Sequence, residues 1–281
     1  MKTRIISSTV ALALLAAVVL LGREAIGLAV FALALVGIHE FYSAAGNGGY
    51  SPVYPLGFIA CLPILYPAVW GKGPDALLES IPLNLVETVS LILFVLVVTA
   101  FCLMIFSRGK FNLADLSITL FGIIYVPFLF SYVALTRNLD LGYLYIWLIF
   151  IGGWVTDIFA YFTGVTVGRT KILPKVSPKK SLEGSIGGVV GCTAAMTAFG
   201  AVFEGALGGI PLYHFIILGV LCGVISQVGD WAASAIKRFV NIKDYGRIMP
   251  GHGGVLDRMD SILFVAPLVY FYISLFMGQA G

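Results

Sequence analysis

Four carboxylates stand inside or at the edge of otherwise apolar segments: Asp157, Asp230, Asp257 and Asp260. An ionised side chain within a bilayer is costly, so each group needs a cationic partner, a water-filled cavity or a chemical role. Asp257 and Asp260 are three residues apart and share one helix face, which lets both point at one ion. Oxygen ligands without clustered Cys or His suit Mg²⁺, which proteins hold with one or two carboxylates plus phosphate oxygens.

A hydroxyl and two cations follow Asp230 on the same side of the predicted helix. Ser234, Lys237 and Arg238 stand four, seven and eight residues further along, so one stripe combines an acid, a hydroxyl and two positive charges. Cations beside a metal-binding acid suit a polyphosphate. A second interpretation stays open, because Asp230 with Lys237 or Arg238 could be a buried ion pair that only fixes helix packing.

Two loops combine glycine, proline and basic residues. Gly251-His252-Gly253-Gly254 precedes a helix predicted to begin near Val255, where backbone N–H groups can face anionic oxygens. The same glycines, after Pro250, are equally compatible with a tight loop. Ser177-Pro178-Lys179-Lys180 is either a site for anionic groups or an inner loop that obeys the positive-inside rule.

The composition of the whole chain indicates a membrane protein. Of its 281 residues, 59% are hydrophobic and 11% are charged, and the mean hydropathy of +1.00 is too high for an ordinary water-soluble globule. A helix of about 20 mostly apolar residues crosses the hydrocarbon layer. The sequence predicts an all-α, polytopic integral membrane protein with about nine transmembrane helices, at 5–21, 25–45, 53–70, 83–106, 113–135, 141–164, 185–205, 211–238 and 255–278. Prolines interrupt the third span, which could be kinked or re-entrant.

Orientation follows from the basic residues, which stay in short loops on the cytoplasmic side. A cytoplasmic N-terminus places all of the 17 Lys and Arg residues inside except Arg23, Lys72 and Arg137. The C-terminus then lies outside, and the cytoplasmic loops 165–184 and 239–254 are the ones richest in basic residues, glycine and proline. In this topology the four carboxylates gather at one membrane depth.

The helix that carries Asp157 has a face suited to close packing. Tyr161 lies four residues after Asp157 on the same face, and Gly164 and Gly168 continue it. Missing side chains at those two glycines permit close approach of a ligand or of another helix. We therefore expect Asp157 and Tyr161 to line the same inner-face layer as the other acids.

One long run resembles the signature of the phosphatidate cytidylyltransferase (CDP-diacylglycerol synthase) family: Ser234-Ala-Ile-Lys237-Arg238, four residues, Lys243-Asp244-Tyr-Gly246, three residues, and Pro250-Gly-His252-Gly253-Gly254-Val-Leu-Asp257-Arg258-Met-Asp260. Upstream, the run 177–184 resembles that family's cytoplasmic loop, and Asp157 with its neighbours resembles the preceding helix. Met249 and Ser181 depart from the commoner residues. The resemblance is sharp over residues 150–262 and generic in the first 140.

The resemblance implies an Mg²⁺-dependent nucleotidyltransferase that joins CTP and phosphatidic acid to give CDP-diacylglycerol and pyrophosphate in phospholipid biosynthesis. It implies Asp230, Asp257 and Asp260 as Mg²⁺ ligands, suggests a monovalent cation such as K⁺ beside them, and gives Ser234, Lys237 and Arg238 catalytic roles. The remaining predicted site residues would bind substrate: Asp157, Tyr161, Ser177, Lys179, Lys180, Lys243, His252, Gly253, Gly254 and Arg258.

Further expectations concern organisation and partners. We expect residues 1–140 to form scaffold helices with dimer contacts and residues 141–281 to carry catalysis. The resemblance implies a homodimer in the bacterial inner membrane, with its active site facing the cytoplasm. The small net charge of +3 gives no reason to expect nucleic acid as a partner.

Two other functions remain as alternatives. A CTP-dependent lipid-alcohol kinase would transfer the terminal phosphoryl group instead of the nucleotidyl group. An ion-coupled transporter would use intramembrane carboxylates to bind ions, but the sequence has no repeated halves and no polar path to the outer face.

Overall fold

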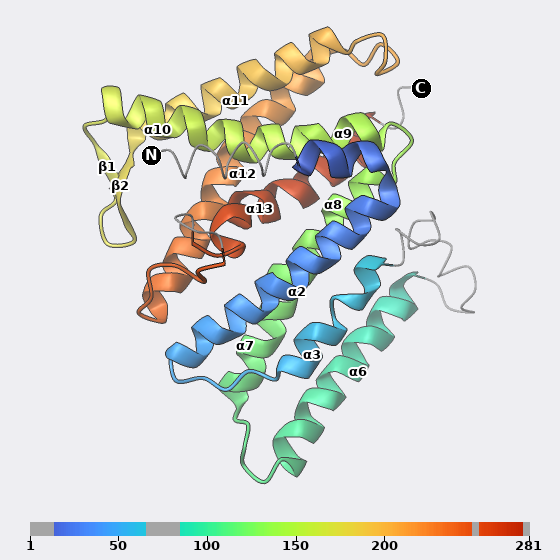
Figure 1. The fold of residues 1–281 in the computed structure, drawn as a ribbon, viewed down its shortest axis with the longest axis vertical. Coiled ribbons are helices and arrows are strands. Elements are labelled where there is room, and N and C mark those ends of the chain that lie inside the picture. The colour runs from blue at the N-terminus through green and yellow to red at the C-terminus, as the bar shows by residue number, and fades with distance from the viewer. Residues whose placement is uncertain (1–13, 66–84, 249–252, 278–281) are drawn as a thin grey trace.

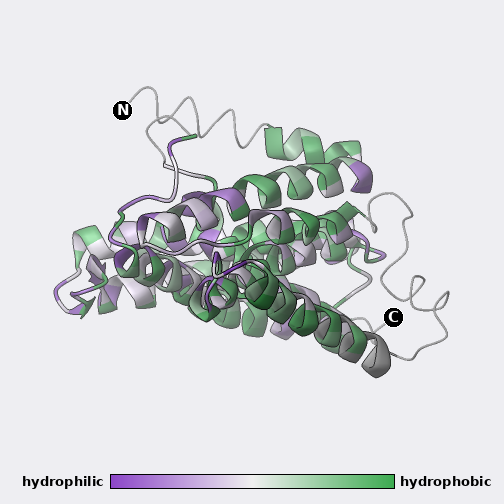
Figure 2. Cartoon of the chain, turned by 90° about the horizontal axis from the view of Figure 1, so that it is seen from below, coloured by the Kyte–Doolittle hydropathy of each residue, from purple (hydrophilic) through white to green (hydrophobic). Residues whose placement is uncertain are grey.

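Long helices dominate the computed structural model, which describes residues 14–65, 85–248 and 253–277 (Figure 1). Six helical stretches among the described residues are long and apolar enough to cross a membrane: Arg23–Asn47, Leu113–Arg137, Gly142–Thr166, Leu182–Val202, Leu212–Phe239 and Leu256–Met277. They match six of the nine predicted spans to within about four residues at each end, as expected for boundary assignment. Hydrophobic residues cover most of the helices, and hydrophilic ones gather mainly toward one end (Figure 2).

The other three predicted spans are covered only in part. The helix α6 (Leu85–Phe106) corresponds to the predicted span 83–106. Residues 14–21 are helical, but the rest of the span 5–21 lies outside the described residues. Within 53–70 the chain forms α3 (Tyr54–Ile59) and a 3₁₀ turn, Leu62–Ile64, and residues 66–84 are not described.

Three of the long helices contain a π-helical turn. The turn Ile124–Phe128 joins α7 (Leu113–Ile123) to α8 (Leu129–Arg137) and contains Pro127, which has no N–H to donate to the regular helix pattern. The others are Ile151–Val155, between α9 (Gly142–Phe150) and α10 (Thr156–Thr166), and Ile273–Met277, which follows α13 (Leu256–Tyr272). Such π-bulges change the direction of a helix without ending it.

The all-α prediction overlooks a short β-hairpin. Its strands, β1 (Lys171–Leu173) and β2 (Ser177–Ser181), pair antiparallel within the predicted cytoplasmic loop 165–184. Strands this short, with Pro174 between them and Pro178 inside the second, give no periodic signal in the sequence. Ser181 then caps α11 (Leu182–Val202), where its Oγ accepts the Gly184 N–H at 3.2 Å.

Close helix crossings assemble the C-terminal part. The helix α12 (Leu212–Phe239) packs against both α11 and α13, and α10 packs along α11 (Figure 1). A Cβ at Gly223 would lie 2.8 Å from the Val189 Cα, and one at Gly184 would lie 3.1 Å from the Gly164 Cα. The predicted close approach of another helix at Gly164 is therefore confirmed.

The N-terminal helices pack around one buried tyrosine. Tyr42 of α2 (Arg23–Asn47) is fully buried, and its hydroxyl donates to the Thr119 carbonyl at 2.9 Å. Gly57 of α3 and Gly122 of α7 lie directly against its ring. One hydrophobic core includes buried residues of the N-terminal helices and of the C-terminal helices.

We predict that Gly122→Ala lowers thermal stability. A Cβ at Gly122 would come within 2.6 Å of the Tyr42 ring and 2.9 Å of the Phe41 ring, and overpacking of a buried site typically costs about 1–3 kcal/mol. Thermal unfolding of detergent-purified protein, followed by Trp fluorescence, measures the change.

Gly46→Ala is the matched control, since Gly46 also lies in a helix but has open space around its Cβ position. It should leave the midpoint unchanged or raise it slightly. Equal losses for both variants would show that the Tyr42 packing is not what stabilises this region.

Candidate active site

Three of the predicted acids come together from three different helices. Asp157 of α10, Asp230 of α12 and Asp260 of α13 interact electrostatically with one another. Gly229 makes this possible, because a Cβ there would lie 2.6 Å from the Asp260 carbonyl oxygen, so α12 and α13 cross in close contact beside Asp230. Ser261 donates from its Oγ to Asp157 Oδ2 at 3.2 Å and from its N–H to Asp260 Oδ1 at 2.8 Å.

Lys180 supplies a cation to this cluster from the β-hairpin. Its Nζ lies 2.7 Å from Asp230 Oδ2, and both side chains are mostly buried. Burial favours the neutral amine, but the carboxylates of Asp230, Asp157 and Asp260 together outweigh that effect and raise the pKa of Lys180 above its ordinary value. Lys180 is therefore a fixed positive charge at neutral pH.

Both carboxylate oxygens of Asp257 are hydrogen-bonded to other groups of the chain. Its Oδ1 accepts a hydrogen bond from Lys237 Nζ at 2.7 Å, and its Oδ2 accepts the N–H groups of Tyr245 and Gly254 at 2.8 and 2.9 Å. The Lys237 ammonium also lies over the Tyr245 ring, 5.3 Å from its centroid. This carboxylate thus ties Tyr245 and Gly254 to α12 and to the start of α13.

The carboxylates of the cluster offer oxygen ligands of the kind that Mg²⁺ prefers. Asp157 Oδ1 is buried without a hydrogen-bond partner, which is unusual for a carboxylate oxygen and leaves a ligand atom inside the cluster. Within the described ranges, no group of three or more His, Cys, Asp or Glu side chains is arranged as a ready-made metal site. A site of two carboxylates completed by phosphate oxygens fits this chemistry.

Among the described residues, the N–H groups that precede and begin α13 are already hydrogen-bonded within the chain. Gly253 adopts a φ of +86°, the left-handed region that favours glycine. The Gly254 N–H is used by Asp257, and the first amides of α13 are also bonded to carboxylates of the chain, so these groups do not point at a free anion. His252 lies outside the described residues.

The other predicted residues are spread around the cluster. Tyr161 is 65% exposed and stands beside Phe162, so it does not share the buried surroundings of Asp157. Arg238 bonds the carbonyls of Val176 and Ile242, at 3.5 and 3.1 Å, and so links the hairpin to the loop after α12. Ser177 and Ser234 are half-buried, while Lys179, Lys243 and Arg258 are exposed.

Sequence reasoning missed three residues at or near the acids, Ser261, Tyr245 and Tyr125. Ser261 bridges Asp157 and Asp260, and its position next to Asp260 was the available signal. Tyr245 is buried, which raises the pKa of its hydroxyl, and this neutral group donates to the Ala233 carbonyl at 3.4 Å. Tyr125, in the π-helical turn that precedes α8, lies near Asp260 and Asp230. No spacing in the sequence indicates this proximity.

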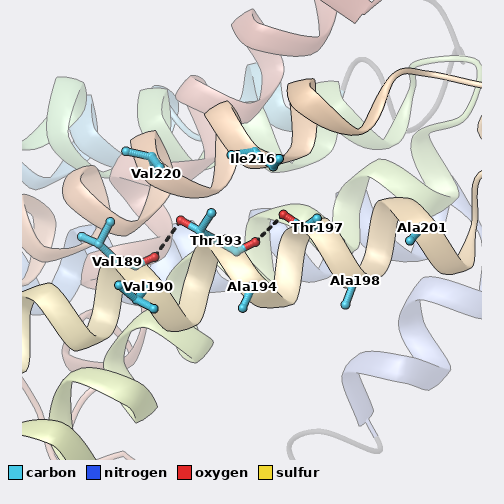
Figure 3. Close-up of a pocket in the computed structure, with 9 residues that line it drawn as sticks. All are labelled: Val189, Val190, Thr193, Ala194, Thr197, Ala198, Ala201, Ile216 and Val220. Carbon is cyan, nitrogen blue, oxygen red and sulfur yellow. Dashed lines mark hydrogen bonds between the residues drawn. The ribbon is translucent and has the colours of Figure 1, made fainter.

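A separate apolar groove lies between α11 and α12 (Figure 3). Its volume is about 740 Å³. The hydroxyls of Thr193 and Thr197 turn back onto the helix carbonyls of Val189 and Thr193, at 2.8 and 2.7 Å, so the surface presents mainly carbon. No ionisable side chain lines it, and it is therefore not the site of the polar chemistry.

The chain is similar in sequence to proteins of known function. The chain matches the profile of the Cytidylyltransferase family over residues 2–276. It is 31% identical to a phosphatidate cytidylyltransferase of Synechocystis sp., over 98% of this chain and 97% of that protein. A phosphatidate cytidylyltransferase of Staphylococcus haemolyticus is 29% identical over 96% and 97%, and one of Bacillus subtilis is 34% identical over 60% and 62%. With a family profile matched along nearly its whole length, this chain belongs to the cytidylyltransferase family.

Proposed function

We propose that this protein is a phosphatidate cytidylyltransferase, which transfers CMP from CTP to phosphatidic acid and releases pyrophosphate. The observation that carries the proposal is the meeting of Asp157, Asp230 and Asp260 with Lys180, where α10, α12 and α13 converge. Acidic and cationic side chains together at one end of apolar helices suit a reaction between a nucleoside triphosphate and a membrane lipid.

We further propose that the acids hold Mg²⁺. Asp230 and Asp260 are the best placed of the predicted ligands, because both belong to the acidic cluster, and Asp157 contributes the unpartnered Oδ1. Asp257 is the third predicted Mg²⁺ ligand. Its Oδ1 becomes available when Lys237 bonds a phosphate oxygen in place of this carboxylate. Bound there, Mg²⁺ would neutralise phosphate charge and stabilise the pyrophosphate leaving group. A monovalent cation such as K⁺ beside it is part of the same proposal.

The chain's own cations orient the reacting groups. The phosphate of phosphatidic acid is anionic near neutral pH, so attack on the α-phosphate of CTP needs positioning and charge neutralisation more than a strong base. Lys180 and Lys237 each sit beside a carboxylate and can exchange that partner for a phosphate oxygen. Arg238 links the hairpin to the residues that follow α12.

The membrane setting extends the proposal. A cytoplasmic N-terminus would put the acidic cluster, the hairpin and the loop 240–254 at the inner face of a bacterial inner membrane, where cytosolic CTP and a lipid headgroup can both arrive. Ser177, Lys179, Lys243 and Arg258 would then face the incoming anions. A homodimer built through the N-terminal helices is also proposed.

Labelled CTP tests the reaction in detergent-purified protein supplied with phosphatidic acid and Mg²⁺. We expect label from the α-phosphate of CTP to appear in the lipid and label from the γ-phosphate to appear in pyrophosphate. Lipid that carries only γ-label would overturn the proposal in favour of a lipid kinase. Ion flux through vesicles without any turnover of CTP would favour a transporter instead.

Lys180→Met tests the role of the hairpin lysine. Removing the cation leaves the buried Asp230 carboxylate without its ion partner and removes a phosphate-neutralising charge, so kcat/KM for CTP should fall by roughly 10²–10³-fold. Initial rates of pyrophosphate release measure the loss.

Lys175→Met is the matched control, because Lys175 is an exposed lysine of the same hairpin. It should keep activity within about twofold, as is usual for surface changes. Equal losses for the two lysines would contradict a specific role for the Lys180–Asp230 pair.

A further inference from the structure

A carboxylate from the N-terminal half reaches the start of α13. Glu40 of α2 is 3% exposed, and its two oxygens accept the N–H groups of Val255 and Leu256 at 3.0 and 2.9 Å. These amides open α13, which carries Asp257 and Asp260. The first N–H groups of a helix have no partner within the helix, and a negative charge there is favourable.

The loop before α13 is built closely around this carboxylate. A Cβ at Gly246 or at Gly254 would overlap the Glu40 carboxylate, and the two glycines also face each other, with the Gly254 Cα 3.2 Å from the Gly246 Cβ position. Larger side chains at either position would push the loop away from α2. The absence of a side chain at these glycines is therefore explained by Glu40.

Other residues of α2 hold the same assembly. Gly37 lies one turn before Glu40 on the same helix face, and a Cβ there would lie 3.1 Å from the Leu256 side chain. At the end of α2, Gly48 packs against Val240, the residue that follows α12. The C-terminal turns of α2 thus contact the chain both where the loop 240–254 begins and where it ends.

We propose that Glu40 is a positioning residue for the cytidylyltransferase reaction, one that fixes the start of α13 so that Asp260 stays in the cluster with Asp157 and Asp230. This inference rests on the proposed active site. Glu40 is buried with both oxygens bonded to backbone N–H groups, so it acts through the two amides and the loop. It also gives the N-terminal half a direct part in shaping the site, beyond lipid contact or dimer formation.

The test compares Glu40→Gln with Asp115→Asn in the full-length protein. Asp115 is an equally buried carboxylate that also accepts two backbone N–H groups, from Ser51 and Asn112 at 2.7 and 2.9 Å, but these bonds lie within the N-terminal half. In Glu40→Gln the amide NH₂ faces one of the α13 N–H donors, so the paired bonds are lost. Asp115→Asn loses stability in the same way without touching α13.

We expect Glu40→Gln to raise the KM for CTP by about 10-fold to 100-fold while the KM for phosphatidic acid stays within about twofold. Asp115→Asn should leave both KM values unchanged. Gly37→Ala, which presses on Leu256 but favours the helix, should raise the KM for CTP in a fully folded protein. A fall in kcat alone, or equal changes in both KM values, would reduce Glu40 to a structural role and overturn the proposal.

Amide hydrogen exchange supplies a readout that does not depend on turnover. Residues 253–262 should exchange faster in Glu40→Gln than in the wild type, whereas the same peptide should be unaffected in Asp115→Asn. Unchanged exchange in Glu40→Gln refutes the positioning role even if the enzyme is active. Failure of the wild type to release pyrophosphate from CTP would instead refute the proposed function.

Discussion

Charge buried among apolar helices is the constraint on which the rest of the structure depends. Asp157, Asp230 and Asp260 repel one another in surroundings that stabilise ions poorly, and they persist because Lys180 and Ser261 supply a positive charge and hydrogen bonds. Such an arrangement is poised to receive a cation or to exchange a lysine for a phosphate. Burying these acids raises the free energy of the folded protein, and the same acids form the proposed active site.

Close helix packing is what brings these groups together. Gly229 lets α12 and α13 approach at the level of Asp230, and Gly184 lets α11 approach α10 beside the hairpin. Because the four helices leave little room at these crossings, the acids cannot easily separate. The carboxylates Asp257 and Glu40 then fasten the loop 240–254 from two sides, one within the C-terminal half and one from outside it.

Six of the nine predicted spans are confirmed among the described residues, and Asp157, Asp230 and Asp260, three of the four predicted acids, lie together, because span length and the depth of charged residues follow from membrane physics. Helical periodicity alone could not show which partner each acid would take. Asp157 meets Ser261 of a distant helix, and Tyr161, four residues away, turns to the surface. Partners across helices depend on tertiary packing, which single-helix spacing does not contain.

The glycine loop and the hairpin illustrate the same limit. The glycines before α13 predicted either an anion-binding turn or a tight loop, and the structure shows the Gly254 N–H bonded to Asp257 and the next two N–H groups bonded to Glu40. A carboxylate 215 residues earlier in the chain leaves no local signature at Val255. The hairpin strands are too short for a periodic pattern, yet they deliver Lys180 to Asp230.

The central claim, that the acids hold a divalent ion together with the triphosphate, is tested most directly by electron paramagnetic resonance of Mn²⁺ in place of Mg²⁺. Detergent-purified wild-type protein with CTP should bind Mn²⁺ and give a spectrum distinct from that of Mn²⁺–CTP in solution. Asp260→Asn should lose that bound signal while remaining folded. Bound Mn²⁺ of unchanged affinity and spectrum in Asp260→Asn would contradict the account.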